Sequence, residues 1–209
     1  RLEGTNGSAA CFDGGSAYLY LGRLAADGTL SGEFHSSSGA FATWSGRRDA
    51  AAKLEDPSRM AGLKPGIDTL DFAFPDLDGT LQRFPDPRHA GKVVIVTIGG
   101  SWCPNCHDEA VFLRELLGTR RERGLEVVQL MFEYTPEFAS AAAAARGFAE
   151  KFAIDYPVLI AGVTHDNDVL KKLPQLASFQ AYPTTLVIDR RGKVRRVHTG
   201  FSGPATGPH

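Results

Sequence analysis

The chain has 209 residues, of which 43% are hydrophobic and 22% are charged, which is enough to bury one ordinary core and a small additional unit. With a formal net charge of -1, the chain as a whole does not generate a positive electrostatic potential that would attract nucleic acid or an anionic membrane. No nucleic-acid partner is expected. No stretch reaches the ~20 apolar residues of a membrane span. Three cysteines are too few for a disulfide-stapled scaffold.

Residues 1–66 are predicted to form a β-rich N-terminal segment followed by a connector. Residues 1–16 are rich in Gly, Ser and Asn, and we expect them to be disordered or poorly packed, with Cys11 an unpaired thiol. Alternating apolar and polar positions then predict strands at residues 18–21, 30–34 and 40–44. Three strands do not make a core alone, so they are either the end of a truncated β-domain or an appendage of the main domain. The connector, residues 47–66, has room for a short helix.

Residues 67–209 alternate between strand and helix patterns, which predicts a mixed three-layer α/β fold with a central sheet. Pro104 suits the first position of a helix, and Gly124 suits its end. The predicted elements are a hairpin at 72–84, a strand at 92–98, a helix at 104–123, a strand at 125–132, a helix capped at 135–137 and running to 152, a strand at 157–161, an irregular helical stretch at 166–179, and a hairpin of strands 184–189 and 193–199.

Two cysteines stand at the point where the apolar strand 92–98 gives way to a helix. Trp102 precedes the sequence Cys103-Pro104-Asn105-Cys106, and cysteines at this spacing share one face of the first helical turn. At the helix N-cap, free backbone N–H groups and the helix dipole stabilise a thiolate on Cys103, whereas Cys106 is more shielded. We therefore predict that Cys103 attacks a disulfide and that Cys106 resolves the mixed disulfide.

The same residues leave two other kinds of site open. Cys103, Cys106 and His107 satisfy the C-x-x-C-H pattern of covalent haem attachment, with His107 as an axial ligand. They also offer three ligands to a metal ion, although no second ligand pair follows at a usable spacing. A dithiol that needs no cofactor and binds no metal fits the preceding buried strand better.

Tyr182-Pro183-Thr184-Thr185 leads directly into a late predicted strand, where a proline is tolerated. Together with the Trp-Cys-x-x-Cys motif, residues 75–79 and residues 91–94, it resembles the thioredoxin-like disulfide reductases of the TlpA/ResA type, in the AhpC/TSA-like thioredoxin superfamily. The resemblance covers residues 67–203. It implies that Pro183 is a cis-proline facing the disulfide, that Tyr182 presents its backbone to the substrate, and that Trp102, Pro104, Tyr182 and Pro183 contact substrate.

Glu109 lies three residues after Cys106 and so falls on the thiol face of the helix. By the resemblance it tunes the cysteines and moves protons; the alternative is a first-turn carboxylate that favours the helix dipole. Thioredoxin carries a buried aspartate where this chain has Thr97, which makes Glu109 the better proton carrier and Glu133 a distant second. The family also ends in a helix that covers the sheet, and we expect this chain to lack it.

The resemblance implies an enzyme, a protein-disulfide oxidoreductase that uses Cys103, Cys106 and Glu109 as catalytic residues. Its partners would be protein thiols or disulfides and an upstream redox donor. Its location would be extracytoplasmic and bacterial, with a membrane tether outside this chain. A thiol peroxidase on the same fold is the nearest alternative, but the proline and threonine usual before its reactive cysteine are absent.

Overall fold

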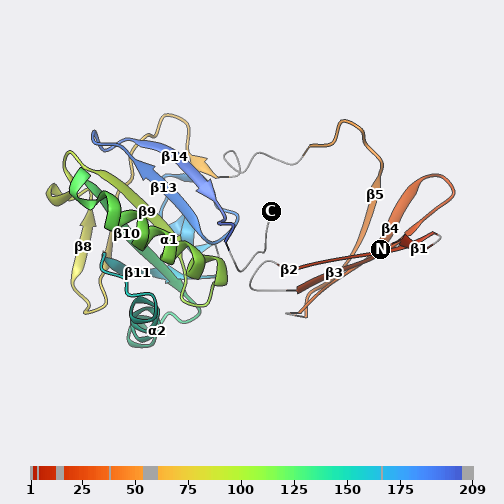
Figure 1. The fold of residues 1–209 in the computed structure, drawn as a ribbon, viewed down its shortest axis with the longest axis horizontal. Helices are drawn as coiled ribbons and strands as arrows, with labels where there is room; N and C mark the ends of the chain where they lie inside the picture. The colour runs from red at the N-terminus through yellow and green to blue at the C-terminus, as the bar shows by residue number, and fades with distance from the viewer. Residues whose placement is uncertain are drawn as a thin grey trace. The chain divides into compact units, whose positions relative to one another are not determined.

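The computed structural model describes residues 2–3, 5–12, 17–37, 39–53, 61–165 and 167–203. The chain forms two compact units, one made mainly of Arg1–Leu54 and the other mainly of Glu55–Pro204 (Figure 1). Among the helices of the described residues, none is both long and apolar enough to cross a membrane.

The first unit is a single antiparallel sheet in which each strand pairs with the next along the chain. The predicted runs 18–21, 30–34 and 40–44 fall within its last three strands. Gly28 at the tip of one hairpin has φ 81°, and the Asp27 carboxylate accepts a hydrogen bond from the Thr29 N–H there. The strands are β1 (Leu2–Glu3), β2 (Asn6–Phe12), β3 (Ala17–Leu24), β4 (Thr29–Ser36) and β5 (Phe41–Arg47).

The expectation that residues 1–16 are disordered is wrong for Asn6–Phe12, which forms strand β2. This strand pairs with β3 along its whole length, from Asn6 opposite Arg23 to Phe12 opposite Ala17. A neighbouring strand supplies backbone hydrogen bonds that outweigh the low strand propensity of Gly, Ser and Asn. Cys11 lies in this strand as an exposed free thiol.

Aromatic rings gather on one face of this sheet. Tyr20 contacts Phe34 and Trp44 with ring centroids 5.0 and 6.4 Å apart. The Trp44 ring lies over Gly22, where an added Cβ would come within 2.7 Å of it. Glycine at this position therefore lets the indole lie flat against the strand.

The second unit contains a five-stranded mixed sheet with the order β11-β10-β9-β13-β14 (Figure 1). Strands β9, β10 and β11 are parallel, while β13 runs antiparallel to β9 and β14 antiparallel to β13, which confirms the predicted mixed α/β sheet. The elements are β9 (Val93–Gly99), α1 (Pro104–Arg120), β10 (Leu125–Glu133), α2 (Phe138–Lys151), β11 (Val158–Val163), β13 (Thr184–Ile188) and β14 (Val194–Thr199).

Both faces of this sheet are covered, because the side chains of each buried strand alternate between two cores. Val96 and Ile98 of β9 pack with Phe72 and Leu173 on one face. On the other face, Ile95 packs with Leu113 and Leu117 of α1, and α2 adds a cluster of alanines. Helices α1 and α2 thus share one face, and the entry hairpin and α3 (Asp168–Lys172) share the other.

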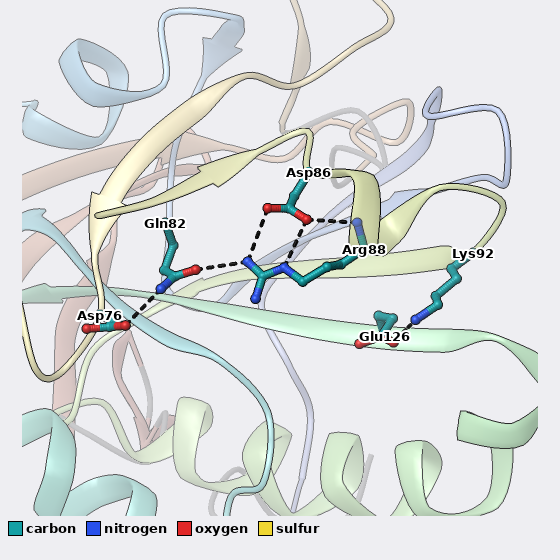
Figure 2. A network of polar contacts seen from close by, with 6 residues as sticks. All are labelled: Asp76, Gln82, Asp86, Arg88, Lys92 and Glu126. Atoms are coloured by element: carbon teal, nitrogen blue, oxygen red, sulfur yellow. Dashed lines mark hydrogen bonds and ion pairs between the residues drawn. The ribbon is translucent and has the colours of Figure 1, made fainter. Parts of the chain in front are cut away.

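A polar network closes the entry hairpin, formed by β7 (Phe72–Pro75) and β8 (Leu81–Phe84). The Gln82 amide donates to Asp76 at 2.9 Å and accepts from Arg88 at 2.9 Å. Arg88 in turn bonds Asp86, which caps the short 3-10 helix Pro87–His89 (Figure 2). The network orders the loop that delivers the chain to β9.

The predicted helical stretch at 166–179 is wrong in its second half. Helix α3 ends at Lys172, and Leu173 leaves helical geometry because Pro174 follows it. Residues Leu176–Ser178 form strand β12, which pairs antiparallel with β6 (Gly62–Leu63). Residues 47–53 and 61–66 of the connector contain no helix, and the rest of it, residues 54–60, lies outside the described part of the chain.

Candidate active site

The two cysteines lie just beyond the carboxyl end of β9, where the loop after this strand passes into the first turn of α1. Two glycines let this loop pack tightly: a Cβ at Gly100 would come within 2.8 Å of the Phe132 carbonyl oxygen, and one at Gly99 within 3.3 Å of the Cys106 sulfur. Cys103 is the N-cap of α1 and Pro104 its first residue. The strand end and the helix start thereby place the dithiol at the edge of the sheet.

Cys103 and Cys106 are both free thiols, 5% and 3% exposed. The Cys103 sulfur accepts a hydrogen bond from the Cys106 backbone N–H at 3.3 Å. A hydrogen bond from the Cys106 thiol lowers the pKa of Cys103, with further help from the backbone N–H groups, whereas burial raises the pKa of Cys106 well above its ordinary value. The first thiol is therefore the one that ionises more readily.

Glu109 lies beneath the dithiol, 4% exposed, on the side of α1 that faces the sheet. Its carboxylate accepts hydrogen bonds from the hydroxyls of Thr97 and Thr185, each at 2.5 Å. Burial raises the pKa of this carboxyl, and the two hydroxyls oppose part of the rise. Glu109 lies in the second turn and is buried, so the interpretation of it as a first-turn helix-dipole residue is wrong.

The two threonines come from neighbouring strands. Thr97 of β9 lies directly opposite Thr185 of β13, and Gln129 of β10 lies opposite Thr97 on the other side. All three side chains are at most 9% exposed. A polar row therefore crosses the sheet below Glu109, next to apolar residues of the same face such as Ile95 and Val127.

Glu133, the second candidate for a proton carrier, contacts the loop before Cys103. Its buried carboxylate, at the end of β10, accepts hydrogen bonds from the Ser101 N–H at 2.9 Å and the Ser101 hydroxyl at 2.7 Å. The Trp102 indole N–H donates to the Phe132 carbonyl oxygen at 2.9 Å. The end of β10 thus holds the residues immediately before Cys103, and we name these contacts the loop clamp.

His107 completes the loop clamp from the helix side. Its Nε2 lies 2.7 Å from the Ser101 carbonyl oxygen, so the ring donates at that nitrogen. The ring also packs against Phe148 and Phe152, with centroids 5.7 and 4.9 Å apart. The His107 imidazole, the axial ligand in the haem interpretation, is therefore hydrogen-bonded to Ser101 and packed against two phenylalanine rings. Among the residues that the structure describes, no group of three potential metal ligands is found.

Aromatic rings line the surface beside Cys103. Trp102 meets Tyr182 edge-on, with ring centroids 5.2 Å apart, and Tyr134 on its other side at 5.0 Å. Phe179 packs against Tyr182 at 4.7 Å. Burial raises the pKa of Tyr182, and the two nearby thiols contribute, so the structure brings this predicted contact residue close to the dithiol.

Pro183 lies at the same edge of the sheet, because Thr184, the residue after it, pairs with Ile98 near the end of β9. The Tyr182–Pro183 peptide bond is cis, and the Pro183 carbonyl oxygen accepts a hydrogen bond from the Gly200 N–H at 2.7 Å. The structure therefore gathers the predicted site residues Trp102, Cys103, Cys106, Glu109, Tyr182 and Pro183 around one end of the sheet.

Sequence reasoning missed several residues of this site. Thr185 stood in the quoted motif without a role, and Ser101 and Tyr134 were not singled out. The available signal for Thr185 was a threonine in a strand whose last three positions, Leu186, Val187 and Ile188, are apolar. No comparable signal existed for Ser101, because its contacts depend on how β10 ends.

The arrangement can carry out two-electron dithiol chemistry. One thiol has a lowered pKa, the second is within reach of it, and a carboxyl group with a raised pKa is buried beside both. A carboxyl with a raised pKa keeps its proton to a higher pH than an exposed one and is therefore better suited to exchange protons with a thiol.

Comparison with known proteins agrees with this chemistry. The chain is 29% identical over 135 residues to the thiol-disulfide oxidoreductase ResA of Geobacillus thermodenitrificans, covering 65% of this chain and 69% of that protein. It is 26% identical over 144 residues to the thioredoxin-like protein YneN of Bacillus subtilis, covering 68% and 75%.

Solved structures show the same fold. A thiol:disulfide interchange protein of the thioredoxin family from Chlorobium tepidum aligns with a TM-score of 0.51 at 21% identity, covering 66% of this chain and 89% of that one. The second unit therefore has a thioredoxin-like fold. The model of the family described as Redoxin matches residues 64–206, which include the whole dithiol site. On this evidence the chain belongs to the redoxin family.

Proposed function

We propose that the protein is a thiol-disulfide oxidoreductase that exchanges electrons with the cysteines of other proteins. The observation that carries this proposal is the asymmetry of the dithiol. Cys103 caps the helix and the pKa of its thiol is lowered, whereas Cys106 lies one turn further into the helix and the pKa of its thiol is raised. A thiolate attacks and a shielded thiol resolves, as thiol-disulfide exchange requires.

In the reducing direction, the Cys103 thiolate attacks one sulfur of the substrate disulfide, and the other substrate sulfur leaves with the electron pair as a thiolate. Cys106 then loses its proton and attacks the Cys103 sulfur. A Cys103–Cys106 disulfide forms, and the second substrate thiolate is released. Two electrons move from the protein to the substrate, and an upstream redox donor restores the dithiol.

The Cys106 proton needs an acceptor during the second step. Glu109 is the buried carboxylate whose charge raises the pKa of both thiols, so it lies within electrostatic reach of them. Once Glu109 takes the proton, its two threonine hydroxyls still hold the carboxyl in place. We therefore assign Glu109 the role of proton carrier.

Trp102, Pro104, Tyr182 and Pro183 are proposed as the substrate contacts around Cys103. The similarity to ResA-type proteins further supports a place outside the cytoplasm of a bacterial cell, with any membrane tether outside this sequence. No cofactor other than the Cys103–Cys106 pair takes part in the proposed exchange.

The order of the two thiols can be tested by trapping. In a Cys11→Ser background, Cys106→Ala should accumulate a mixed disulfide with a peptide that contains one intrachain disulfide, because nothing resolves the bond to Cys103. Cys103→Ala, the matched control, should accumulate none. Mass spectrometry of the unreduced proteins measures the adducts. Equal adducts from both variants, or none from either, would contradict the proposal.

A further inference from the structure

Tyr134 is the first residue after β10, and its side chain is 67% exposed. Its ring nevertheless has a defined place, because it packs on Trp102 with centroids 5.0 Å apart and planes 33° apart. Trp102 is itself fixed by the loop clamp through its indole N–H. One side of the Tyr134 ring is therefore supported, while most of its surface faces solvent.

This ring extends the aromatic surface that begins at Tyr182. The contacts run from Tyr182 to Trp102 and from Trp102 to Tyr134, and Cys103 directly follows the central ring in the chain. Thr135, the residue after Tyr134, lines a hollow of about 600 Å³ that also borders β7, the carboxyl end of β11 and α3. Pro136, Phe138 and Val163 line part of it, and Phe138 is 38% exposed.

A substrate sulfur that reacts with Cys103 must come close to the protein surface, since Cys103 is only 5% exposed. The chain on either side of the substrate cysteine then lies on the residues around the opening. A rigid, solvent-facing aromatic ring gains free energy by covering its apolar surface, at a small cost in side-chain entropy. The complementary group is an apolar side chain near the substrate cysteine.

Building on the proposed function, we infer that Tyr134 is a specificity-determining residue that binds an apolar side chain flanking the reactive cysteine of a protein substrate. The occupant is an extended segment of the substrate, continuing from Tyr134 towards the hollow. Small disulfides lack such a segment and do not use this contact.

The test uses three disulfides of thionitrobenzoate: two peptides that carry it on a single cysteine, flanked by phenylalanines or by serines, and the symmetric small molecule. In each reaction the Cys103 thiolate attacks one sulfur, the S–S bond breaks, and thionitrobenzoate leaves with the electron pair. Cys106 then closes the protein disulfide and releases the other thiol. The coloured leaving group gives the rate by stopped-flow absorbance.

We expect the wild-type protein to react about tenfold faster with the phenylalanine-flanked peptide than with the serine-flanked one, a difference of ~1.4 kcal/mol. Tyr134→Ala should remove that preference by slowing the reaction with the phenylalanine-flanked peptide about tenfold. Tyr134→Phe keeps the ring and should keep the preference. Phe112→Ala, which removes an exposed aromatic ring that packs on Phe201 instead, serves as the matched control.

The outcomes separate this inference from the proposed function. If the wild-type protein reacts with none of the three disulfides, the proposed function fails. If it reacts but Tyr134→Ala keeps the full preference, or slows all three reactions equally, Tyr134 does not determine specificity. A thiolate titration of Tyr134→Ala that matches the wild type shows that the variant leaves the dithiol intact.

Discussion

Glu109 places a third titratable group directly beside two thiols, so three protons compete within one buried site. Burial raises the pKa of its carboxyl, and hydrogen bonds from Thr185 and Thr97 favour the charged form. Once ionised, the carboxylate raises the pKa of Cys103 and of Cys106. Proton affinity at this residue is therefore linked to the reactivity of the attacking sulfur.

Glu109→Gln removes the charge without removing a sulfur, and we expect it to lower the pKa of Cys103. It should also slow the second step of exchange, because glutamine cannot accept the Cys106 proton. Thiolate absorbance titrations in a Cys11→Ser background measure the first effect. Glu115→Gln, on the exposed side of the same helix, is the control and should leave the titration unchanged. Superimposable curves for Glu109→Gln and wild type would disprove the coupling.

The wild type and Glu109→Gln should also differ in how their stability depends on pH. Because the folded pKa of Glu109 is raised, the folded protein binds more protons than the unfolded chain once the pH exceeds about 4.3, the ordinary glutamate value. The free energy of unfolding of the wild type therefore falls as pH rises from there through the folded pKa. Glu109→Gln lacks this loss, so urea unfolding should show its relative stability increasing over that window.

At the scale of elements, the loop before α1 takes its shape from the end of a different strand. The Glu133 carboxylate satisfies both the backbone N–H and the hydroxyl of Ser101, and the Phe132 carbonyl holds the Trp102 indole. The end of strand β10 thus positions the loop before Cys103, although Glu133 and Ser101 lie 32 residues apart in the sequence.

Glu133→Ala leaves the Ser101 N–H without its partner, and we expect it to lower the free energy of unfolding by ~1–3 kcal/mol. Ser101→Ala loses only the hydroxyl contact and should cost about 0.5–1.5 kcal/mol. The double variant should cost less than the sum of the two, since both remove the same hydrogen bond. Urea unfolding of the reduced wild type, the two single variants and the double variant measures these losses as a double-mutant cycle. Additive losses would show that the two residues act independently.

Much of this element-level arrangement could be predicted from the sequence. Pro104 marked the start of the helix that carries the dithiol, and Gly124, with φ 82°, ends the 3-10 turn Arg121–Arg123 that separates it from Arg120, the last residue of the helix itself. The buried strands were recognisable as apolar runs. These patterns are local: each predicts a helix or a strand, but not which other elements it packs against or pairs with.

What could not be predicted depends on pairing between distant segments. Strand β2 has little intrinsic preference for a strand and forms because β3 lies beside it. Strand β12 pairs with residues more than a hundred positions earlier. Likewise, Thr185 meets Glu109 only because β13 takes a register that puts it opposite Thr97. Periodicity shows which face a residue takes and says nothing about register.

At the scale of the whole molecule, the dithiol unit has cores of its own. All three clusters of buried apolar residues consist of residues from Ala61 onward, and the first unit is a sheet without a comparable buried cluster among its described residues. Contacts that hold Cys103, Cys106 and Glu109 all lie within the second unit.

A chain of residues 55–209 should therefore unfold cooperatively and react with the small thionitrobenzoate disulfide within about twofold of the full chain. The comparison needs Cys11→Ser in the full chain, because the deletion also removes that thiol. Thermal unfolding and stopped-flow absorbance are the two measurements. A fragment that unfolds without a transition, or that reacts more than tenfold slower, would show that the first unit supports the second.

The hydrogen bond between Thr185 and Glu109 spans 76 positions of the sequence. A polypeptide emerges amino-terminus first, whether from a ribosome or from a translocation pore, so both motif cysteines are exposed well before Thr185 follows. Until the last hairpin docks beside β9, the carboxylate lacks one of its two donors. Cys11 has by then emerged as well, and in an oxidising compartment it can be linked to either motif cysteine. A bond of Cys11 to Cys103 or Cys106 would remove a thiol from the pair, so biogenesis of an active protein requires that such a bond be avoided or repaired before the C-terminal hairpin arrives.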